Sequence, residues 1–250
     1  MFKQAVARWC YKNTSIEDLA REGARMGLKG IDLIGPDEWP VARKHGLVPS
    51  MVSPPGSNNT AGWCDRANHD RLEAACLDMI PRLAAIGAPN LIAVSGNRRG
   101  LSDAQGIENT VAGLRRIIRA AEDHNVTVCL ELMNSKVNHK DYMADRTAWG
   151  VEVCRRVDSP RMKLLYDIYH MQIMEGDVIR TIRENIHYIG HFHTGGVPGR
   201  HELDDTQELK WRGIAQAIAD LGFTGFVAHE FIPVRDPLKS LEEAVRICSV

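Results

Sequence analysis

Two glutamates, an aspartate and a histidine each stand near the end of a short apolar run in the second half of the sequence: Glu131, Asp167, His193 and Glu230. Their oxygen donors and one imidazole suit Mg²⁺ or Mn²⁺ better than a soft metal. Ionised carboxylates are rarely buried without a partner, and three of them close together repel unless a cation lies between them. A lone glutamate in an apolar strand is often structural, but four such residues on four successive strands favour a divalent metal site.

Short apolar runs rich in Val, Ile and Leu alternate with longer amphipathic segments along the whole chain, which predicts alternating strands and helices. The expected strands are residues 3–8, 30–35, 47–53, 90–95, 127–133, 163–169, 187–194 and 226–231. The expected helices are residues 15–26, 40–45, 68–86, 102–124, 145–157, 177–185, 210–221 and 237–248. The pattern of Ser15 followed by Asp18 predicts a capped start for the first helix, and Gly27 stands at its end.

Eight strand-then-helix units imply parallel strands, because each return to the sheet needs a crossover connection. An open doubly wound sheet and a closed (β/α)8 barrel both satisfy this order. No G-x-G-x-x-G and no G-x-x-x-x-G-K-[ST] motif occurs in the chain, so the nucleotide-binding open sheet loses its main support. We therefore expect an α/β fold, a single TIM-barrel domain over residues 1–250. Active sites of such barrels lie at the carboxyl ends of the strands, where the four residues above stand.

Composition limits the classes of function. The 250 residues include 31 Lys plus Arg and 32 Asp plus Glu. This balance lacks the basic excess that is typical of nucleic-acid binding proteins. No apolar stretch resembles a signal peptide or approaches the ~20 residues of a membrane span. Six cysteines without a C-x-x-C pair indicate buried thiols in a reducing compartment. We expect a cytoplasmic protein with neither a nucleic-acid nor a membrane partner.

Two strings add a more specific signal. LLYDIYHMQIMEG at 164–176 and VPGRHE at 197–202 resemble the hydroxypyruvate isomerase family. That family belongs to the xylose-isomerase-like TIM barrels, which also include ketose 3-epimerases and endonuclease IV. The resemblance is strongest from Glu131 to Glu230, and the first 120 residues add little beyond the order of strands and helices.

The resemblance implies a role for each matching position. Glu131 and Glu230 match the paired catalytic carboxylates that also bind the metal, while Asp167 and His193 match the other two ligands. His193 stands where the family has Gln or His, and the His resembles the epimerase branch. His170 and Arg200 match positions that contact substrate oxygens. Residues 133–142 depart from the usual loop, which leaves the identity of the substrate open.

The expected activity is that of an aldose–ketose type isomerase, an intramolecular oxidoreductase dependent on Mg²⁺ or Mn²⁺. It would interconvert a small 2-oxo hydroxy acid and its aldehyde isomer, as in the pair hydroxypyruvate and tartronate semialdehyde. One glutamate would remove a proton from the carbon beside the polarised carbonyl, and a metal-bound enediolate would take the proton back on the neighbouring carbon. Which glutamate begins is left open, and so is the oligomeric state, a homo-oligomer included.

Several alternatives stand beside this interpretation. A ketose 3-epimerase differs in whether Arg200 meets a sugar hydroxyl or a carboxylate. An endonuclease IV-like phosphodiesterase needs additional ligands on the earlier strands, and a sugar-acid binding protein would have no use for two glutamates around a metal. Arg200 has a structural alternative, an ion pair with Glu202 or Asp204. His170 has one too, the orientation of Asp167.

Overall fold

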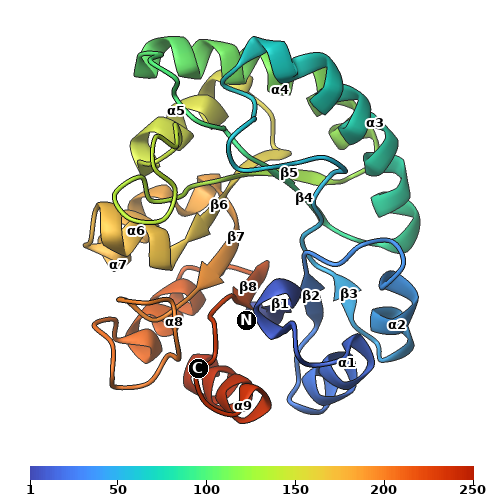
Figure 1. Cartoon of the computed structure of the whole chain (residues 1–250), viewed down its shortest axis with the longest axis vertical. Helices are drawn as coiled ribbons and strands as arrows, with labels where there is room; N and C mark the ends of the chain where they lie inside the picture. Colours follow the sequence, from blue (N-terminus) through green and yellow to red (C-terminus); the bar gives the residue numbers. More distant parts are fainter. The chain divides into compact units, whose positions relative to one another are not determined.

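A computed structural model describes all residues from Met1 to Val250. The chain divides into two compact units. Unit 1 comprises residues 1–52, 177–186 and 191–250, and unit 2 comprises residues 53–176 and 187–190. The prediction of one domain over residues 1–250 stays a prediction. Figure 1 shows the helices and strands of both units.

Unit 1 contains the first three strands, the last strand and most of the seventh. Its elements are β1 (Lys3–Ala7), η1 (Arg8–Tyr11), α1 (Ile16–Arg25), β2 (Gly30–Asp32), α2 (Trp39–Lys44), β3 (Val48–Pro49), α7 (Val178–Asn185), the end of β7 (Ile189–Thr194), α8 (Trp211–Asp220), β8 (Phe226–His229) and α9 (Pro237–Cys248). The strands pair in parallel, β1 with both β2 and β8, β2 with β3, and β7 with β8. Ala5 lies beside Ala228 in this register, and both pack with Phe226 in a buried cluster.

Unit 2 contains the middle strands and the longest helices. Its elements are η2 (Arg66–Asn68), α3 (His69–Ile86), β4 (Asn90–Ala93), α4 (Asp103–Asp123), β5 (Thr127–Glu131), α5 (Thr147–Val157), β6 (Met162–Asp167) and α6 (Ile168–Met174). The segment η3 (Ile186–Tyr188) leads into β7. The strands β4, β5 and β6 pair in parallel, and α3 and α4 run along one another in Figure 1.

The strand order is β3-β2-β1-β8-β7-β6-β5-β4 in one sheet. Eight parallel strands with helices between them confirm the predicted α/β class and the (β/α)8 order of elements. Most strands are shorter than predicted, because several strand-like runs continue as loop. The second strand ends at Asp32 rather than residue 35, and the sixth ends at Asp167, where a helix that the sequence analysis did not predict begins at Ile168.

Side chains and glycines set the helix ends. Ser15 accepts a hydrogen bond from the Asp18 backbone N–H at 3.0 Å, which confirms the predicted cap of α1. Ser102 and Gln105 form a reciprocal capping box at the start of α4. The helix α3 ends at Gly87, which has φ of 73°, a left-handed conformation that favours glycine. These local signals explain why helix positions were predicted within a few residues.

The cysteines behave as small apolar side chains. None of the six forms a disulfide, and five are buried. Burial raises the pKa of the Cys76, Cys154 and Cys248 thiols to about 12, so these thiols are neutral and unreactive at physiological pH. The described helices also include none that combines the length and the apolar character needed to cross a membrane.

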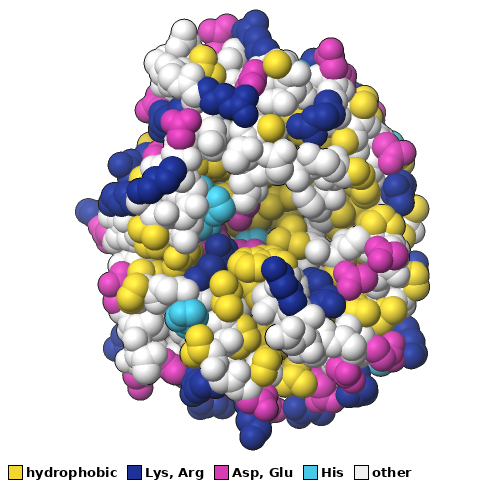
Figure 2. All heavy atoms as spheres, viewed as in Figure 1, with side chains coloured by type: hydrophobic (Ala, Val, Ile, Leu, Met, Phe, Trp, Pro, Cys, Tyr) yellow, Lys and Arg dark blue, Asp and Glu magenta, His cyan; other side chains and the backbone are white.

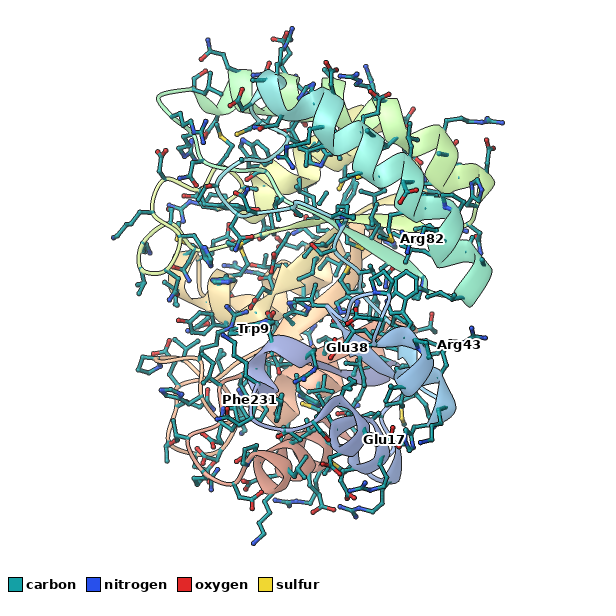
Figure 3. The ribbon with its side chains drawn as sticks, turned by 45° about the vertical axis from the view of Figure 1, so that its right-hand side comes forward. Trp9, Glu17, Glu38, Arg43, Arg82 and Phe231 are labelled. Atoms are coloured by element: carbon teal, nitrogen blue, oxygen red, sulfur yellow. The ribbon has the colours of Figure 1, made fainter.

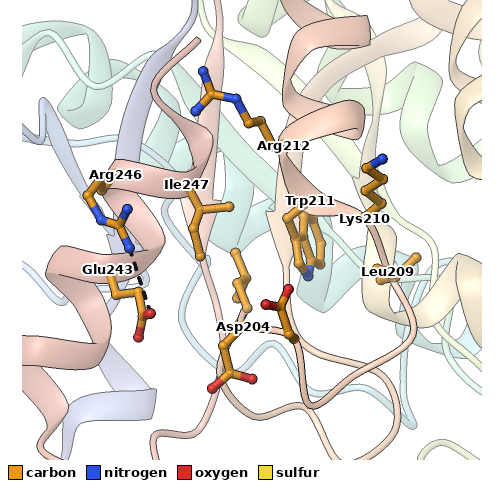
Figure 4. Close-up of a pocket in the computed structure, with 10 residues that line it drawn as sticks. Asp204, Leu209, Lys210, Trp211, Arg212, Glu243, Arg246 and Ile247 are labelled. Atoms are coloured by element: carbon orange, nitrogen blue, oxygen red, sulfur yellow. Dashed lines mark ion pairs between the residues drawn. The ribbon is translucent and has the colours of Figure 1, made fainter.

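The surface carries mixed charge. Figure 2 shows Lys and Arg side chains interspersed with Asp and Glu side chains across the visible face, in agreement with a net charge of −1. A pocket of about 290 Å³ lies between the loop after β7, the start of α8 and the helix α9 of unit 1 (Figure 4). Arg246 and Glu243 form an ion pair of 3.8 Å in its wall. The pocket contains none of the six predicted site residues.

The last strand is joined to the first through a buried histidine of unit 1. His229 is fully buried, its Nε2 donates to Gln4 Oε1 at 2.8 Å, and its Nδ1 lies 3.3 Å from the Thr194 hydroxyl. Gln4 in turn donates to the Val245 carbonyl of α9 at 3.3 Å. Burial lowers the pKa of His229 to about 3, so the folded protein holds this ring neutral.

Because His229 is buried and neutral, we expect the free energy of unfolding to depend on pH. An unfolded histidine titrates near ~6.5, so between that pH and about 3 only the unfolded chain binds the proton, and the free energy of unfolding falls as the pH falls. We expect His229→Gln to reduce this slope by about 1 kcal/mol per pH unit between pH 6 and 4, measured by urea unfolding. The matched change His124→Gln, on an exposed residue after α4, should keep the wild-type slope. An equal slope in wild type and His229→Gln would contradict a neutral buried ring.

Candidate active site

Glu230 follows directly after β8 and is almost completely buried, with 3% of its surface exposed. Its carboxylate is contacted from three sides by residues of unit 1. Trp9 Nε1 donates to Oε1 at 2.5 Å, and His193 Nδ1 lies 2.7 Å from Oε2. The Arg200 guanidinium forms an ion pair with Oε2. One buried anion therefore organises three side chains from three different segments.

These contacts keep the carboxylate ionised. Burial by itself raises the pKa of Glu230, but the charge of Arg200 and then of His193, with the hydrogen bonds from His193 and Trp9, outweighs burial and lowers the pKa well below its usual range. A buried charge with close, hydrogen-bonded partners is the arrangement in which such a group persists. Glu230 is thus a carboxylate at neutral pH.

Arg200 reaches Glu230 from the loop after β7. The loop contains a cis peptide bond between Val197 and Pro198, and Arg200 itself has φ of 60°. The Arg200 backbone N–H donates to the Gly196 carbonyl at 2.8 Å, and the Ile232 N–H donates to the Arg200 carbonyl at 2.7 Å. The guanidinium lies over the Trp9 ring, 5.4 Å from its centre. These contacts hold both the backbone and the side chain of Arg200 in place.

The structural alternative of an Arg200 ion pair with Glu202 or Asp204 is not what the structure contains, since Arg200 pairs with Glu230 on another element. Glu202 accepts hydrogen bonds from the Val234 and Arg235 backbone N–H groups and from the Ser240 hydroxyl. The two acidic groups of this region thus have separate functions. Glu202 holds the loop before α9, and Glu230 holds the arginine.

Trp9 belongs to the segment that follows β1, and Phe231 to the segment that follows β8. Both are labelled in Figure 3. Phe231 contacts the Tyr11 ring edge-on, with 6.2 Å between ring centres. The aromatic packing of these two segments places the Trp9 indole N–H on the Glu230 carboxylate. This donor role of Trp9 was not predicted from the sequence.

His193 lies near the end of β7 and is completely buried. Its Nδ1 faces Glu230, and its Nε2 lies 3.1 Å from Asp32 Oδ2. Burial lowers the pKa of His193, but the Glu230 charge and the hydrogen bonds that the ring donates to both carboxylates outweigh burial and raise the pKa well above its usual value. The histidine is therefore held between two acidic groups of unit 1.

Asp32, the last residue of β2, is the acidic residue that sequence analysis missed. It is fully buried, and the same Oδ2 lies 2.6 Å from His191 Nε2. Burial raises the pKa of Asp32, but the charge of His191 and the hydrogen bonds from both histidines overcome burial and lower the pKa to about 2. An aspartate in the apolar run GIDLI was the available signal, hidden because the strand was expected to continue to residue 35.

In unit 2, Glu131 ends β5 and Asp167 ends β6. Both are buried, and their nearest ligand atoms lie within 4.8 Å of each other. Asp167 also begins α6, since its Oδ1 accepts the His170 backbone N–H at 3.2 Å. Tyr142 donates from its hydroxyl to the Glu131 carbonyl at 3.1 Å. The two strand ends thus present a pair of buried carboxylates.

His170 is buried beside this pair, and its hydrogen bonds define its tautomer. Asn134 Oδ1 accepts the Val137 and Asn138 backbone N–H groups, so its amide nitrogen is the group that faces His170 Nδ1, at 2.6 Å. Nδ1 must then accept, which leaves the proton on Nε2. Nε2 lies 3.6 Å from Asp167 Oδ2, beyond a normal hydrogen bond but close enough for an electrostatic attraction.

The predicted residues therefore occur as two groups. His193, Glu230 and Arg200 are in contact within unit 1, and Glu131, Asp167 and His170 lie together within unit 2. Three of the four predicted metal ligands are carboxylates, and the fourth is an imidazole. That donor set fits a hard divalent cation such as Mg²⁺ or Mn²⁺. The additional cluster of Asp32, His191 and His193 also has donor atoms within 4.8 Å of one another.

Comparison with known proteins assigns the chain to a family. A family model described as xylose isomerase-like TIM barrel matches residues 40–248. A human protein named putative hydroxypyruvate isomerase is 26% identical over 209 residues, 80% of this chain and 76% of that protein. A 2-oxo-tetronate isomerase of Pectobacterium atrosepticum is 24% identical over 227 residues, 86% of each chain. The names of these relatives agree with the predicted enzyme class, an isomerase.

Solved structures show the same fold. The crystal structure of an AP endonuclease, family 2, from Brucella melitensis has a TM-score of 0.86 at 22% identity, covering 96% of this chain and 97% of that one. At this identity the likeness concerns the fold alone. The family match over residues 40–248 and this likeness confirm the fold and the resemblance predicted from the two sequence strings. The chain belongs to the xylose isomerase-like TIM-barrel family.

Proposed function

We propose that the chain is a divalent-metal-dependent isomerase that interconverts a small 2-oxo hydroxy acid and its aldehyde isomer, as in the pair hydroxypyruvate and tartronate semialdehyde. The observation that carries this proposal is the buried, ionised Glu230 carboxylate in contact with His193 and Arg200. A base for proton transfer must be ionised and positioned, and the contacts of Glu230 supply both conditions.

Glu131, Asp167, His193 and Glu230 are the residues that would hold the cation. They match the metal-ligand positions of the family that the two sequence strings resemble, and active sites of such barrels lie at the carboxyl ends of the strands. A divalent cation, when bound, would polarise the substrate carbonyl and so acidify the neighbouring C–H bond. Mg²⁺ and Mn²⁺ are the proposed ions, on the chemistry of the four donors.

The two glutamates would move the proton. In the forward direction one carboxylate takes the proton from the carbon beside the carbonyl, and the electron pair of the broken C–H bond forms the double bond of an enediolate. The same or the other carboxylate returns a proton to the adjacent carbon, and the hydroxyl proton passes between the two oxygens. Reactant and product are then isomers, and no redox partner is required.

His170 and Arg200 are proposed to contact substrate oxygens. The tautomer set by Asn134 places the His170 proton on Nε2, which makes that nitrogen a hydrogen-bond donor. A guanidinium has five N–H donors in a planar fork, so Arg200 can hold Glu230 and also contact a substrate carboxylate. The residue would then couple recognition of an acidic substrate to the position of the base.

The remaining alternatives differ in ligand chemistry. A ketose 3-epimerase would use the same carboxylates with Arg200 on a sugar hydroxyl, and a phosphodiesterase would need a nucleic-acid surface that a net charge of −1 does not favour. We propose a small hydroxy-keto acid over both, with a cytoplasmic location supported by cysteines that form no disulfide. A homo-oligomer is compatible with this proposal.

Glutamate variants test the proton transfer. We expect Glu131→Gln and Glu230→Gln each to lower the rate of isomerisation by about 10²–10⁴-fold, because the amide cannot accept the proton. The measurement is proton NMR in deuterated solvent, with hydroxypyruvate, 2-oxo-tetronate and ketoses as the panel. Glu108→Gln, on an exposed residue of α4, is the matched control and should keep the wild-type rate. Ketose turnover without keto-acid turnover would favour the epimerase, and solvent exchange with neither class would refute both isomerases.

Metal removal tests the cofactor. Dialysis against a chelator should abolish isomerisation, and Mn²⁺ or Mg²⁺ should restore it, because four hard donors favour these ions. Asp167→Asn should weaken Mn²⁺ binding, measured by the electron paramagnetic resonance signal of free Mn²⁺. Full activity in the chelator-treated protein, with metal content verified by elemental analysis, would contradict a metal-dependent mechanism.

Arg200 variants test the buried ion pair. Removing one partner of such a pair leaves an uncompensated charge, so we expect Arg200→Met to lower the free energy of unfolding by about 3 kcal/mol. Arg200→Lys keeps the charge but loses the planar fork and should have an intermediate effect. Arg212→Met, on an exposed residue of α8, should change stability by less than about 0.5 kcal/mol. Equal stabilities for Arg200→Met and Arg212→Met in urea unfolding would contradict the role of the pair.

A further inference from the structure

A buried polar chain extends behind His193 within unit 1, away from Glu230. His193 Nε2 lies 3.1 Å from Asp32 Oδ2, and the Ser50 hydroxyl donates to Asp32 Oδ1. Asp32, Ser50 and His193 are all fully buried, on three different strands or their ends. A Cβ atom at Gly30 would lie 2.2 Å from the Ser50 hydroxyl oxygen, so the glycine leaves the space in which Ser50 reaches the aspartate.

The aspartate fixes which nitrogen of His193 faces which neighbour. A carboxylate is an acceptor, so the hydrogen on Nε2 points to Asp32. The other nitrogen, Nδ1, is directed to Glu230 at 2.7 Å. A histidine that binds a metal through one nitrogen commonly donates from the other to a carboxylate, which fixes the tautomer and the ring orientation.

His191 is the second histidine that contacts Asp32. Asp32 Oδ2 and His191 Nε2 are only 2.6 Å apart, which is a hydrogen-bond distance. His191 therefore acts as a second donor to Asp32 and holds the carboxylate from another side.

We propose that Asp32 is a positioning residue that holds His193 with its Nε2 hydrogen on the carboxylate and directs Nδ1 to Glu230, where a divalent cation would displace the Nδ1 proton. This inference rests on the proposed metal-dependent function. Ser50 and His191 hold Asp32, and Asp32 holds the histidine. Asp32 would act through His193, so we expect its effect in metal binding.

The test is the Mn²⁺ affinity of Asp32→Asn, measured by the electron paramagnetic resonance signal of free Mn²⁺. We expect affinity to fall by about 10–100-fold, the usual effect of removing the carboxylate behind a metal-binding histidine. Ser50→Ala should reduce affinity by a smaller factor in the same direction. Asp205→Asn, on an exposed residue of the loop before α8, is the matched control and should bind Mn²⁺ like wild type.

A second measurement needs no variant. Nitrogen-15 NMR of histidine-labelled wild-type protein should find that His193 keeps its proton on Nε2, while Nδ1 loses its proton and shifts, when Zn²⁺, a diamagnetic probe, is added. Coordination through Nε2 of His193 or through His191 would overturn the inference, even if Asp32→Asn failed to fold. Wild-type affinity in a folded Asp32→Asn protein would also overturn it while leaving the metal site intact. A wild-type protein that binds no divalent cation would refute the proposed function and this inference together.

Discussion

The Glu230 carboxylate is a buried negative charge, and the arrangement of unit 1 around it follows from that one constraint. A charge of this kind persists in a protein interior only with close, hydrogen-bonded partners. Trp9, His193 and Arg200 are those partners, and they come from the segment after β1, from β7 and from the loop after β7. A single side chain thereby fixes the segment after β1 against β7 and the loop that follows β7.

The same constraint explains the second acidic group behind His193. A histidine between Glu230 and Asp32 has an acceptor at each nitrogen, so the ring has little freedom to rotate. Asp32 is in turn held by Ser50 and His191. Polar groups that would each be costly to bury are satisfied as a connected set, which makes the position of each depend on the others.

The sequence predicted the parts of this protein that depend on periodicity. Alternating apolar runs identified all eight strands, and Ser15 identified the start of α1, because these signals are local. Asp32 was missed since a three-residue strand gives too little alternation to locate its end. The helix α6 was missed because its cap, Asp167, also completes an apolar strand. Arg200 was placed on the correct loop, but its partner Glu230 is 30 residues away and no local pattern indicates it.

Strand ends and loops contribute differently to the candidate site. Glu131, Asp167 and His193 lie at or next to the end of a strand, and the side chains that orient the site, Trp9, Asn134 and Arg200, come from connecting segments. Strand positions are tied to the sheet register, because a shift by one residue would turn each side chain to the other face. Connecting segments vary freely in length and composition. Relatives of 24–26% identity can therefore share the fold while their connecting segments differ, and the departure at residues 133–142 lies in such a segment.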